Sequence, residues 1–478
     1  MAGIGFQLKE LYNQSNFFAQ LRAYGFSAII AVGPMFLCIL LITAAREWLM
    51  HLDTPSSEID LFIASVQYVF IFSQILTGGF MFVISRFLAD QMYLKKEEKV
   101  LSSMYGAISI VLLIGFIVAV IFYWSSPVSL MFKFITYLFY VELNIIWILS
   151  IYMSALKDYR KIVKGYLLGV AVAALIIWAA TGLFGIETAS AVFIGLDIGF
   201  LLIAIMLMRD ILNFFQLNNK QYFYFLTYME KYPFLFFIGL FYYLGLYGHN
   251  FAIWLGNRKV YVADTFLMAP YYDTPVFYAY FSLLPALILF MVTLETTFYT
   301  AYKKYYRCIL KGSPLHDIEK AKHDMYRTLR FEILFLAQVQ LLVTVVFLFM
   351  GIHFLPFLGL IQDQIDIFIA VVLGSWFLSL LITFLLILLY FDERKAAFSL
   401  TIFYAISSFI ATILFSGIFG MDGAGMFIGA VFSLGYGCWL LNRQLNEIDY
   451  STFCYQPIVY KEKITRTERF LRKVGSLD

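Results

Sequence analysis

Charged residues are scarce in this sequence. Asp, Glu, Lys and Arg together make up 14% of its 478 residues, whereas hydrophobic residues make up 62%. Soluble globular domains contain about 25% charged and about 45–50% apolar residues. The composition therefore excludes an ordinary soluble domain and indicates an integral membrane protein, for which the net charge of +3 is a sign of topology and not of nucleic-acid binding.

Cysteine is also rare, and the familiar motifs of nucleotide and metal chemistry are missing. The four cysteines are Cys38 and Cys438 in apolar runs, and Cys308 and Cys454 in segments predicted to be cytoplasmic, so no disulfide framework is expected outside the membrane. The sequence lacks GxxxxGK[ST], HExxH, CxxC and any histidine-rich cluster, which excludes phosphate-loop nucleotide hydrolysis and predicts neither a metal nor a cofactor.

Long apolar runs dominate the sequence. About 20 apolar residues are needed to cross about 30 Å of hydrocarbon, and twelve runs of this kind predict an all-α fold with twelve transmembrane helices. The predicted spans are Tyr24–Ala45, Asp60–Ser85, Ser102–Trp124, Phe132–Leu156, Gly165–Phe184, Ala189–Met208, Phe234–Trp254, Val276–Tyr302, Phe331–Leu355, Ile365–Phe391, Ala397–Phe419 and Gly423–Leu441.

The distribution of Lys and Arg supports this count and predicts the orientation. The two termini and the even-numbered connections contain 30 of the 34 Lys and Arg residues, whereas the odd-numbered connections contain 3, and Lys133 lies at the start of the fourth predicted span. Because short cytoplasmic loops retain positive charge, both termini are predicted to lie in the cytoplasm of a cell whose inner membrane the chain spans. Residues 1–22 place Ile4, Leu8, Leu11 and Phe18 on one helical face and predict an interfacial amphipathic helix.

An internal repeat divides the chain into halves. The turn Thr181–Ser190 matches Ser416–Gly425 at an offset of 235 residues, and the connection Asp158–Lys161 matches Asp392–Lys395 at an offset of 234. The offset covers six helices, an even number, so it predicts two parallel six-helix repeats, an arrangement used by transporters. The predicted domains are an N-lobe over 23–212, a cytoplasmic connection over 213–233, a C-lobe over 234–442 and a basic cytoplasmic tail over 443–478.

Several polar residues lie inside predicted membrane helices. Glu142 and Asp197 lie near the middle of the fourth and sixth helices, His249 and Asn250 in the outer half of the seventh, and Glu295 in the eighth. An ionisable side chain at mid-membrane costs at least about 2.5–3.5 kcal/mol on insertion scales, which makes all five candidates for a transport cavity. A purely structural role, in which the carboxyls are protonated or bonded to hydroxyls, stays equally open for Glu142 and Asp197.

Comparison of the halves favours a functional role for the two carboxyls. At an offset of 234 residues Glu142 corresponds to Trp376, and Asp197 corresponds to Val431, so the scaffold accepts apolar residues at these places. Four glutamines within the membrane are predicted to form hydrogen bonds between helices: Gln67, Gln74, Gln338 and Gln340.

The first helix of each half contains residues that weaken a helix. Gly33 and Pro34 lie in the first helix, and Gly245 and Gly248 precede His249 in the seventh. Proline removes a backbone donor and glycine lowers helix propensity, so these four positions are predicted hinges. Close helix packing is the simpler alternative.

Four stretches resemble a known family. They are the opening MAGIGFQLKEL, the LRAYGF and GP of the first helix, YYLGLYGHNFAIW (Tyr242–Trp254) and PYYDTPVFYAYFSLLP (Pro270–Pro285). Over essentially the whole chain the sequence resembles the PelG family, the membrane transporters of Pel exopolysaccharide systems, which is similar to the multidrug/oligosaccharidyl-lipid/polysaccharide (MOP) flippase superfamily that includes MATE transporters. The resemblance implies two six-helix lobes in a V around a central cavity.

The resemblance also implies a substrate and partners. The substrate would be a polymer rich in N-acetylgalactosamine, and the partners would be a cytoplasmic glycosyltransferase of the PelF type and other Pel membrane components. Two further transport functions remain open, a lipid-linked oligosaccharide flippase and a cation-coupled drug exporter. A membrane O-acyltransferase, suggested by His249 beside Asn250, is disfavoured by the twelve repeated helices. The sequence does not decide between an ion gradient and chain elongation as the energy source.

Overall fold

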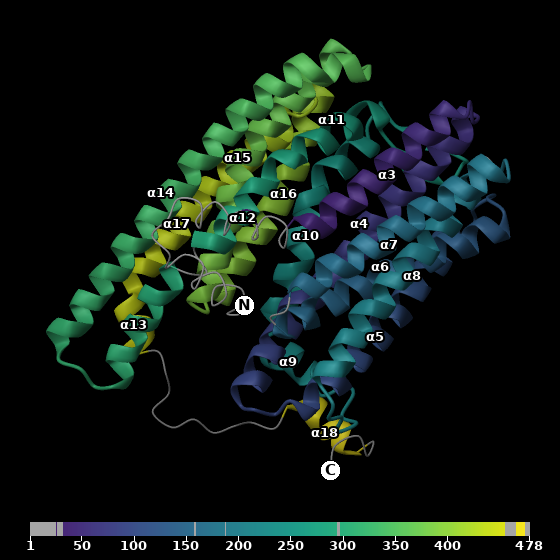
Figure 1. Ribbon diagram of the computed structural model, residues 1–478. Helices are drawn as coiled ribbons and strands as arrows, with labels where there is room; N and C mark the ends of the chain where they lie inside the picture. Colours follow the sequence, from purple (N-terminus) through teal and green to yellow (C-terminus); the bar gives the residue numbers. More distant parts are fainter. Residues whose placement is uncertain are drawn as a thin grey trace. The chain divides into compact units, whose positions relative to one another are not determined.

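The computed structural model describes residues 25, 32–156, 159–186, 188–293, 297–454 and 465–473. Within these residues, twelve helical segments are long and apolar enough to cross a membrane. They dominate the fold in Figure 1, and each overlaps one of the twelve predicted spans. The predicted helix count is therefore confirmed, and the chain is a multi-pass membrane protein. The predicted interfacial helix over 1–22 lies outside the described residues.

The helices of the first half are α3 (Gly33–His51), α4 (Ser56–Tyr93), α5 (Glu98–Tyr123), α6 (Leu130–Leu156), α7 (Tyr159–Trp178), the π-helical turn η1 (Ala179–Leu183) and α8 (Ala189–Phe214). The short helix α9 (Leu226–Lys231) connects the halves. Several of these helices extend beyond the predicted spans because their polar ends continue past the hydrocarbon region.

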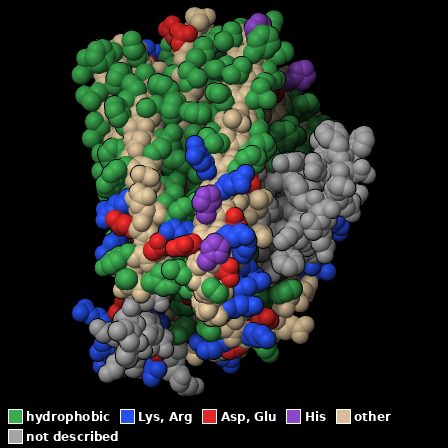
Figure 2. Space-filling view, turned by 90° about the vertical axis from the view of Figure 1, so that its left-hand side faces the viewer, with side chains coloured by type: hydrophobic (Ala, Val, Ile, Leu, Met, Phe, Trp, Pro, Cys, Tyr) green, Lys and Arg blue, Asp and Glu red, His purple; other side chains and the backbone are tan. Residues whose placement is uncertain are grey.

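The elements of the second half are α10 (Pro233–Trp254), β1 (Val260–Val262), β2 (Phe266–Met268), α11 (Pro270–Tyr280), the 3-10 turn η2 (Phe281–Leu283), α12 (Leu284–Thr293), α13 (Tyr299–Leu310), α14 (Leu315–Phe354), η4 (Leu355–Leu358), α15 (Gln362–Tyr390), α16 (Arg394–Phe419), α17 (Ala424–Phe453) and α18 (Arg466–Lys473). Figure 2 shows hydrophobic side chains over much of one face, with Lys and Arg gathered toward its lower part. An apolar face of this kind is what lipid contact requires.

Packing divides the chain into two compact units. Unit 2 comprises Pro34–Gly248, Asn257–Ala269 and the described residues of Asn446–Asp478, and unit 1 includes His249–Gly256 and Pro270–Leu445. The boundary therefore falls inside α10, after Gly248. Sequence repetition and packing density are different criteria, so the lobe boundaries drawn from the repeat remain a prediction.

The internal repeat is visible in the backbone. Gly185 and Gly420, which are equivalent in the repeat, have φ angles of 65° and 66°, a left-handed conformation that glycine adopts readily. Gly195 and Gly429 are also equivalent, and a Cβ on either would lie within 3.4 Å of backbone atoms of the neighbouring helix, α7 for the first and α16 for the second. The same glycines therefore form the same tight turn and the same close helix contact in both halves.

The outer loop predicted to follow the seventh helix forms a β-hairpin. β1 and β2 are antiparallel, with Tyr261 opposite Leu267, and the turn residues Ala263 and Asp264 have φ angles of 48° and 46°, as a type I′ turn requires. The hydroxyl of Tyr68 in α4 donates to the carbonyl of Leu267 (2.7 Å) and accepts from its N–H (2.8 Å). The hairpin is therefore fixed to α4 within unit 2.

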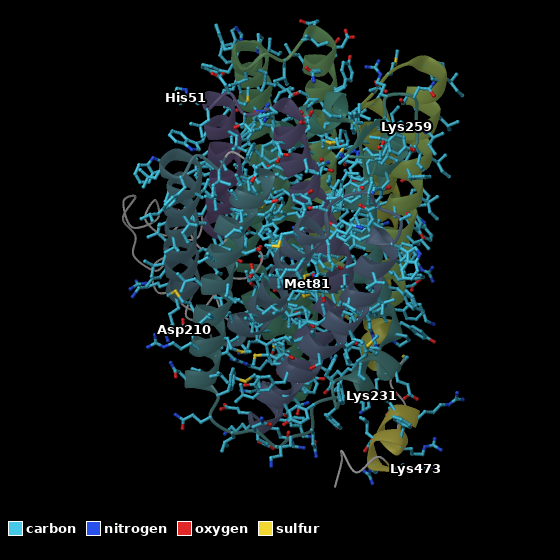
Figure 3. All side chains as sticks on the ribbon, turned by 90° about the vertical axis from the view of Figure 1, so that its right-hand side faces the viewer. His51, Met81, Asp210, Lys231, Lys259 and Lys473 are labelled. Atoms are coloured by element: carbon cyan, nitrogen blue, oxygen red, sulfur yellow. The ribbon has the colours of Figure 1, made fainter. Side chains whose placement is uncertain are left out.

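Labelled residues of unit 2 show that its helix ends alternate between two levels. Figure 3 places His51 and Lys259 toward one end, Met81 at middle height, and Asp210, Lys231 and Lys473 toward the other end. His51 ends α3 and Lys259 follows α10, whereas Lys231 precedes α10. This is the alternation that membrane-spanning helices joined by short connections produce.

Candidate functional site

Glu142 and Asp197 come together inside unit 2. They lie on α6 and α8, which pack against each other, and their side chains are 7% and 8% exposed. They are close enough to interact electrostatically. Among the residues that the structure describes, neither Oε2 of Glu142 nor Oδ1 of Asp197 has a hydrogen-bond partner. Two predicted site residues from different helices thus form one buried acidic pair.

Helical periodicity explains why both carboxyls lie at the contact between α6 and α8. Phe193, Asp197 and Phe200 lie on one face of α8, and Phe139 and Glu142 lie on one face of α6. The Phe139 ring packs against Phe193 and Phe200, with centroid distances of 5.7 and 5.0 Å. The acidic pair is therefore embedded in an aromatic contact between two helices, where buried carboxyl oxygens without a partner need an explanation.

His249 occupies a different position, inside unit 1. Its Nδ1 lies 2.8 Å from the hydroxyl of Tyr272, and its Nε2 lies 2.6 Å from the hydroxyl of Tyr280. The ring is fully buried, at 0% exposure. In a neutral imidazole one nitrogen donates and the other accepts, so one tyrosine hydroxyl accepts and the other donates. His249 thus fastens the carboxyl-terminal part of α10 to α11, and this interhelical bonding is a structural role that needs no part in transport.

Asn250 forms a hydrogen bond with Asp273, a residue that the sequence did not single out. Its Nδ2 donates to Oδ1 of Asp273 (2.8 Å), and Nε1 of Trp254 donates to Oδ2 of the same carboxylate (2.9 Å). Asp273 is buried in α11, although the sequence predicted a loop at this position. The available signal was the segment PYYDTP, which starts with the proline that is common at the first position of a helix.

The eighth transmembrane helix is interrupted. The sequence predicted one continuous helix over Val276–Tyr302, whereas a 3-10 turn at Phe281–Leu283 separates α11 from α12. Pro285 has no N–H to donate to the carbonyls of this turn. Nε2 of Gln340 in α14 donates to the carbonyl of Ser282 at 2.7 Å, which confirms the predicted role of Gln340 in interhelical bonding and satisfies a backbone group that the proline leaves free.

A second proline in the same helix has a similar arrangement. Pro275 lies inside α11 and cannot donate to the carbonyl of Tyr271, four residues earlier. Nε2 of Gln364 in α15 donates to that carbonyl at 3.3 Å. Glutamine side chains from two helices therefore support the two irregular points of the eighth helix, next to the tyrosines that bond His249.

The remaining predicted site residues have different outcomes. Glu295 lies outside the described residues. α3 begins at Gly33 with Pro34 in its first turn, and α10 continues without a break through Gly245 and Gly248, so their roles as hinges stay predictions. Among the residues that the structure describes, no three His, Cys, Asp or Glu side chains gather in a way that would hold a metal ion.

Comparison with solved structures identifies the fold. The eukaryotic MATE transporter AtDTX14 matches with a TM-score of 0.60 and 11% identity, over 95% of this chain and 98% of that chain. The bent form of VcmN, a MATE transporter of Vibrio cholerae, matches with a TM-score of 0.56 and 12% identity, over 94% and 99%. An inward-facing multidrug resistance MATE transporter of the MOP superfamily matches with a TM-score of 0.54 and 14% identity, over 89% and 99%.

Comparison of sequences identifies the family. No curated protein sequence matches this chain. A family model described as "PelG: Putative exopolysaccharide Exporter (EPS-E)" matches residues 1–453, and family and fold together indicate a transporter. The chain belongs to the PelG family of exopolysaccharide exporters and has the fold of MATE transporters of the MOP superfamily.

Proposed function

We propose that this chain exports a Pel-type exopolysaccharide, rich in N-acetylgalactosamine, across the cytoplasmic membrane. The family match over residues 1–453 carries the proposal, because MATE-like architecture alone is shared with drug exporters. The excess of Lys and Arg in alternate connections supports an orientation with both termini in the cytoplasm. A cytoplasmic glycosyltransferase of the PelF type would supply the polymer, and other Pel membrane components would assemble with the exporter.

The acidic pair Glu142 and Asp197 is proposed as the transport site of unit 2. A polymer of N-acetylgalactosamine would be uncharged, so it would offer hydroxyl and amide donors but no cation. Two buried carboxyls with unpartnered oxygens can accept hydrogen bonds from such donors, or they can hold a proton or a cation. Because the buried carboxyls could hold a proton or a cation, they also favour a cation-coupled exporter as the alternative function.

A deletion experiment tests the substrate. Removal of the gene should abolish secreted polymer while the glycosyltransferase activity of the cytoplasm is retained. Secretion at the wild-type level after deletion contradicts export by this chain. Accumulation of undecaprenyl-linked intermediates would show the lipid-linked flippase instead.

Isosteric substitutions test the acidic pair. Glu142→Gln and Asp197→Asn keep the shape and hydrogen-bonding capacity but remove ionisation. If the carboxyls bond sugar hydroxyls, the amides should retain much of the export, whereas a coupling proton requires ionisation and both variants should then lose it. Thermal stability of the purified variants is the control, and full export by the double alanine variant removes the pair from the site.

We also propose that α10 bends at Gly245 and Gly248. The inner part of α10 is held to α4 by the hydrogen bond from Tyr247 to Gln74 (2.5 Å), whereas the part from His249 onward packs with α11. The change of packing falls directly after Gly248. Replacing Gly245 and Gly248 with alanine stiffens the helix and should slow polymer export. Because both glycines are buried, thermal unfolding of the variant is the control for a steric clash. Export at the wild-type rate would exclude this hinge.

A further inference from the structure

The carboxyl-terminal helix α18 lies beyond the segment that defines the family. The family match ends at residue 453, and α18 runs from Arg466 to Lys473. It packs against α9, the connection between the halves, within unit 2. The helix thus lies outside the segment that the family model matches.

A single carboxylate holds the start of α18. Glu230 in α9 accepts hydrogen bonds from the N–H of Arg466 (2.8 Å), the N–H of Thr467 (2.8 Å) and the hydroxyl of Thr467 (2.8 Å). These bonds satisfy donors that the first turn of a helix leaves free. The two backbone N–H bonds contribute most to holding the pKa of Glu230 below its ordinary value, so the carboxylate stays charged opposite the positive end of the helix dipole.

The two faces of α18 differ in chemistry. Thr467, Glu468 and Leu471 form the docked face, and Leu471 is 6% exposed. The opposite face, at the helical spacing i, i+3, i+4 and i+7, is what we name the outward stripe: Arg466, Arg469, Phe470 and Lys473. All four residues of this stripe are exposed, and Phe470 is 63% exposed. Lys, Arg and an exposed Phe are residue types that helices use at a membrane interface, although here the phenylalanine lies on the same face as the cations.

α18 is docked close to the start of a membrane-spanning helix. α9, on which α18 is docked, ends at Lys231, two residues before the membrane-spanning helix α10 begins at Pro233. Figure 3 shows Lys231 and Lys473 toward the same end of unit 2. Lys99, at the start of α5, interacts electrostatically with Lys96, Lys231 and Glu468. Glu98 also lies near Lys99, so this cluster is mixed in sign. The excess of positive charge is on the outward stripe, which has three cations and no carboxylate and favours an anionic ligand.

We propose that the outward stripe of α18 binds the anionic headgroups of phospholipids in the leaflet on the side of the carboxyl terminus. Arg466, Arg469 and Lys473 contact the headgroup phosphates, and Phe470 inserts at the boundary of the acyl chains. Glu230 sets the orientation of the helix, because its hydrogen bonds fix the first turn and hence the direction in which the stripe faces. A cation near an anionic bilayer strengthens binding by roughly fivefold, so loss of all three should weaken it by about a hundredfold.

Hydrogen exchange of the full-length protein in nanodiscs tests the proposal. Exchange of residues 465–473 is measured in nanodiscs of phosphatidylcholine and in nanodiscs that also contain phosphatidylglycerol. We expect slower exchange with phosphatidylglycerol at low salt and no difference at high salt. The variant Arg466→Gln, Arg469→Gln, Lys473→Gln keeps the helix-forming side chains and should lose the response to phosphatidylglycerol.

A matched variant and a second probe make the result decisive. The control Lys303→Gln, Lys304→Gln, Arg307→Gln removes the same charge from α13 and should leave the response of α18 intact. Phe470→Ser, which changes no charge, should weaken the response partly and covers the case in which the triple variant undocks α18. An unchanged exchange rate on adding phosphatidylglycerol overturns the proposal, as does a full response in the triple variant. Protection by inorganic phosphate in phosphatidylcholine nanodiscs would instead show a site for free phosphate.

Discussion

The hydrogen bonds of His249 allow a test that separates a structural role from a role in transport. His249→Phe removes the bonds to Tyr272 and Tyr280, which measure 2.8 and 2.6 Å. An unsatisfied buried polar group costs about 1–3 kcal/mol in soluble proteins, whereas interhelical hydrogen bonds in membranes average about 0.6 kcal/mol. The membrane value applies here because helices separated within a bilayer still find polar partners. Two bonds at this average then give a loss of about 1 kcal/mol.

The triple variant with phenylalanine at positions 249, 272 and 280 should reverse this loss. Replacing both partners of a hydrogen bond by apolar groups of similar shape can be nearly neutral, so the triple variant should be more stable than His249→Phe alone. His249→Gln retains a donor and an acceptor and should fall between the wild type and His249→Phe. Thermal unfolding of purified protein measures stability, and secreted polymer measures export.

The two readouts together decide the role of His249. A triple variant that is no more stable than His249→Phe refutes the hydrogen-bonded network as the reason for the loss. If stability and export both recover, His249 is a structural fastening between α10 and α11. If stability recovers and export does not, the imidazole itself takes part in transport.

Three further predictions rest on single contacts. A Cβ on Gly239 would lie 1.9 Å from a backbone oxygen of α4, so Gly239→Ala should lower stability by about 1–3 kcal/mol or more. A Cβ on Gly417 would have nothing within 4 Å, so Gly417→Ala should be neutral or stabilising. Thermal unfolding measures both variants. Gln340→Leu leaves the carbonyl at the 3-10 turn without its donor and should lower the free energy of unfolding by about 1–2 kcal/mol. Gln338 is exposed, so Gln338→Leu should leave stability unchanged. Equal losses of stability in the two variants would contradict the role of Gln340. Because the docked state holds the pKa of Glu230 below its ordinary value of 4.5, the contribution of Glu230 to docking of α18 should be present above pH 4.5 and fade as the pH falls through the lowered pKa. Hydrogen exchange of α18 that is unchanged by acid, or by Glu230→Gln at neutral pH, would contradict this.

The eighth transmembrane helix shows where sequence reasoning failed. Its hydropathy predicted one span over Val276–Tyr302, and the structure begins the helix at Pro270 and interrupts it at Phe281–Leu283. Pro275 and Pro285 were visible in the sequence, but a proline can kink, start or end a helix. Which of these happens depended on Gln340 and Gln364, whose donors reach the affected carbonyls from other helices.

The candidate site shows the same limit. Glu142 and Asp197 could be chosen from the sequence because an ionisable group in an apolar run is costly wherever its helix lies. Their proximity could not be predicted, because it depends on the relative rotation of α6 and α8. Asp273 was assigned to a loop, and its bonds to Asn250 and Trp254 became visible only when α11 was placed beside α10.

The sequence by itself determined the number of membrane spans, the repeat and the family. These properties depend on the transfer of whole segments from water to hydrocarbon and on charge counts between them, and both add up along the chain. Only the tertiary structure decided which polar groups meet: the acidic pair of unit 2, the bonds of His249 and the docking of α18 on Glu230. Such pairings form over about 3 Å, and each step of one residue along a helix turns a side chain by about 100°, so they are fixed by packing and not by composition.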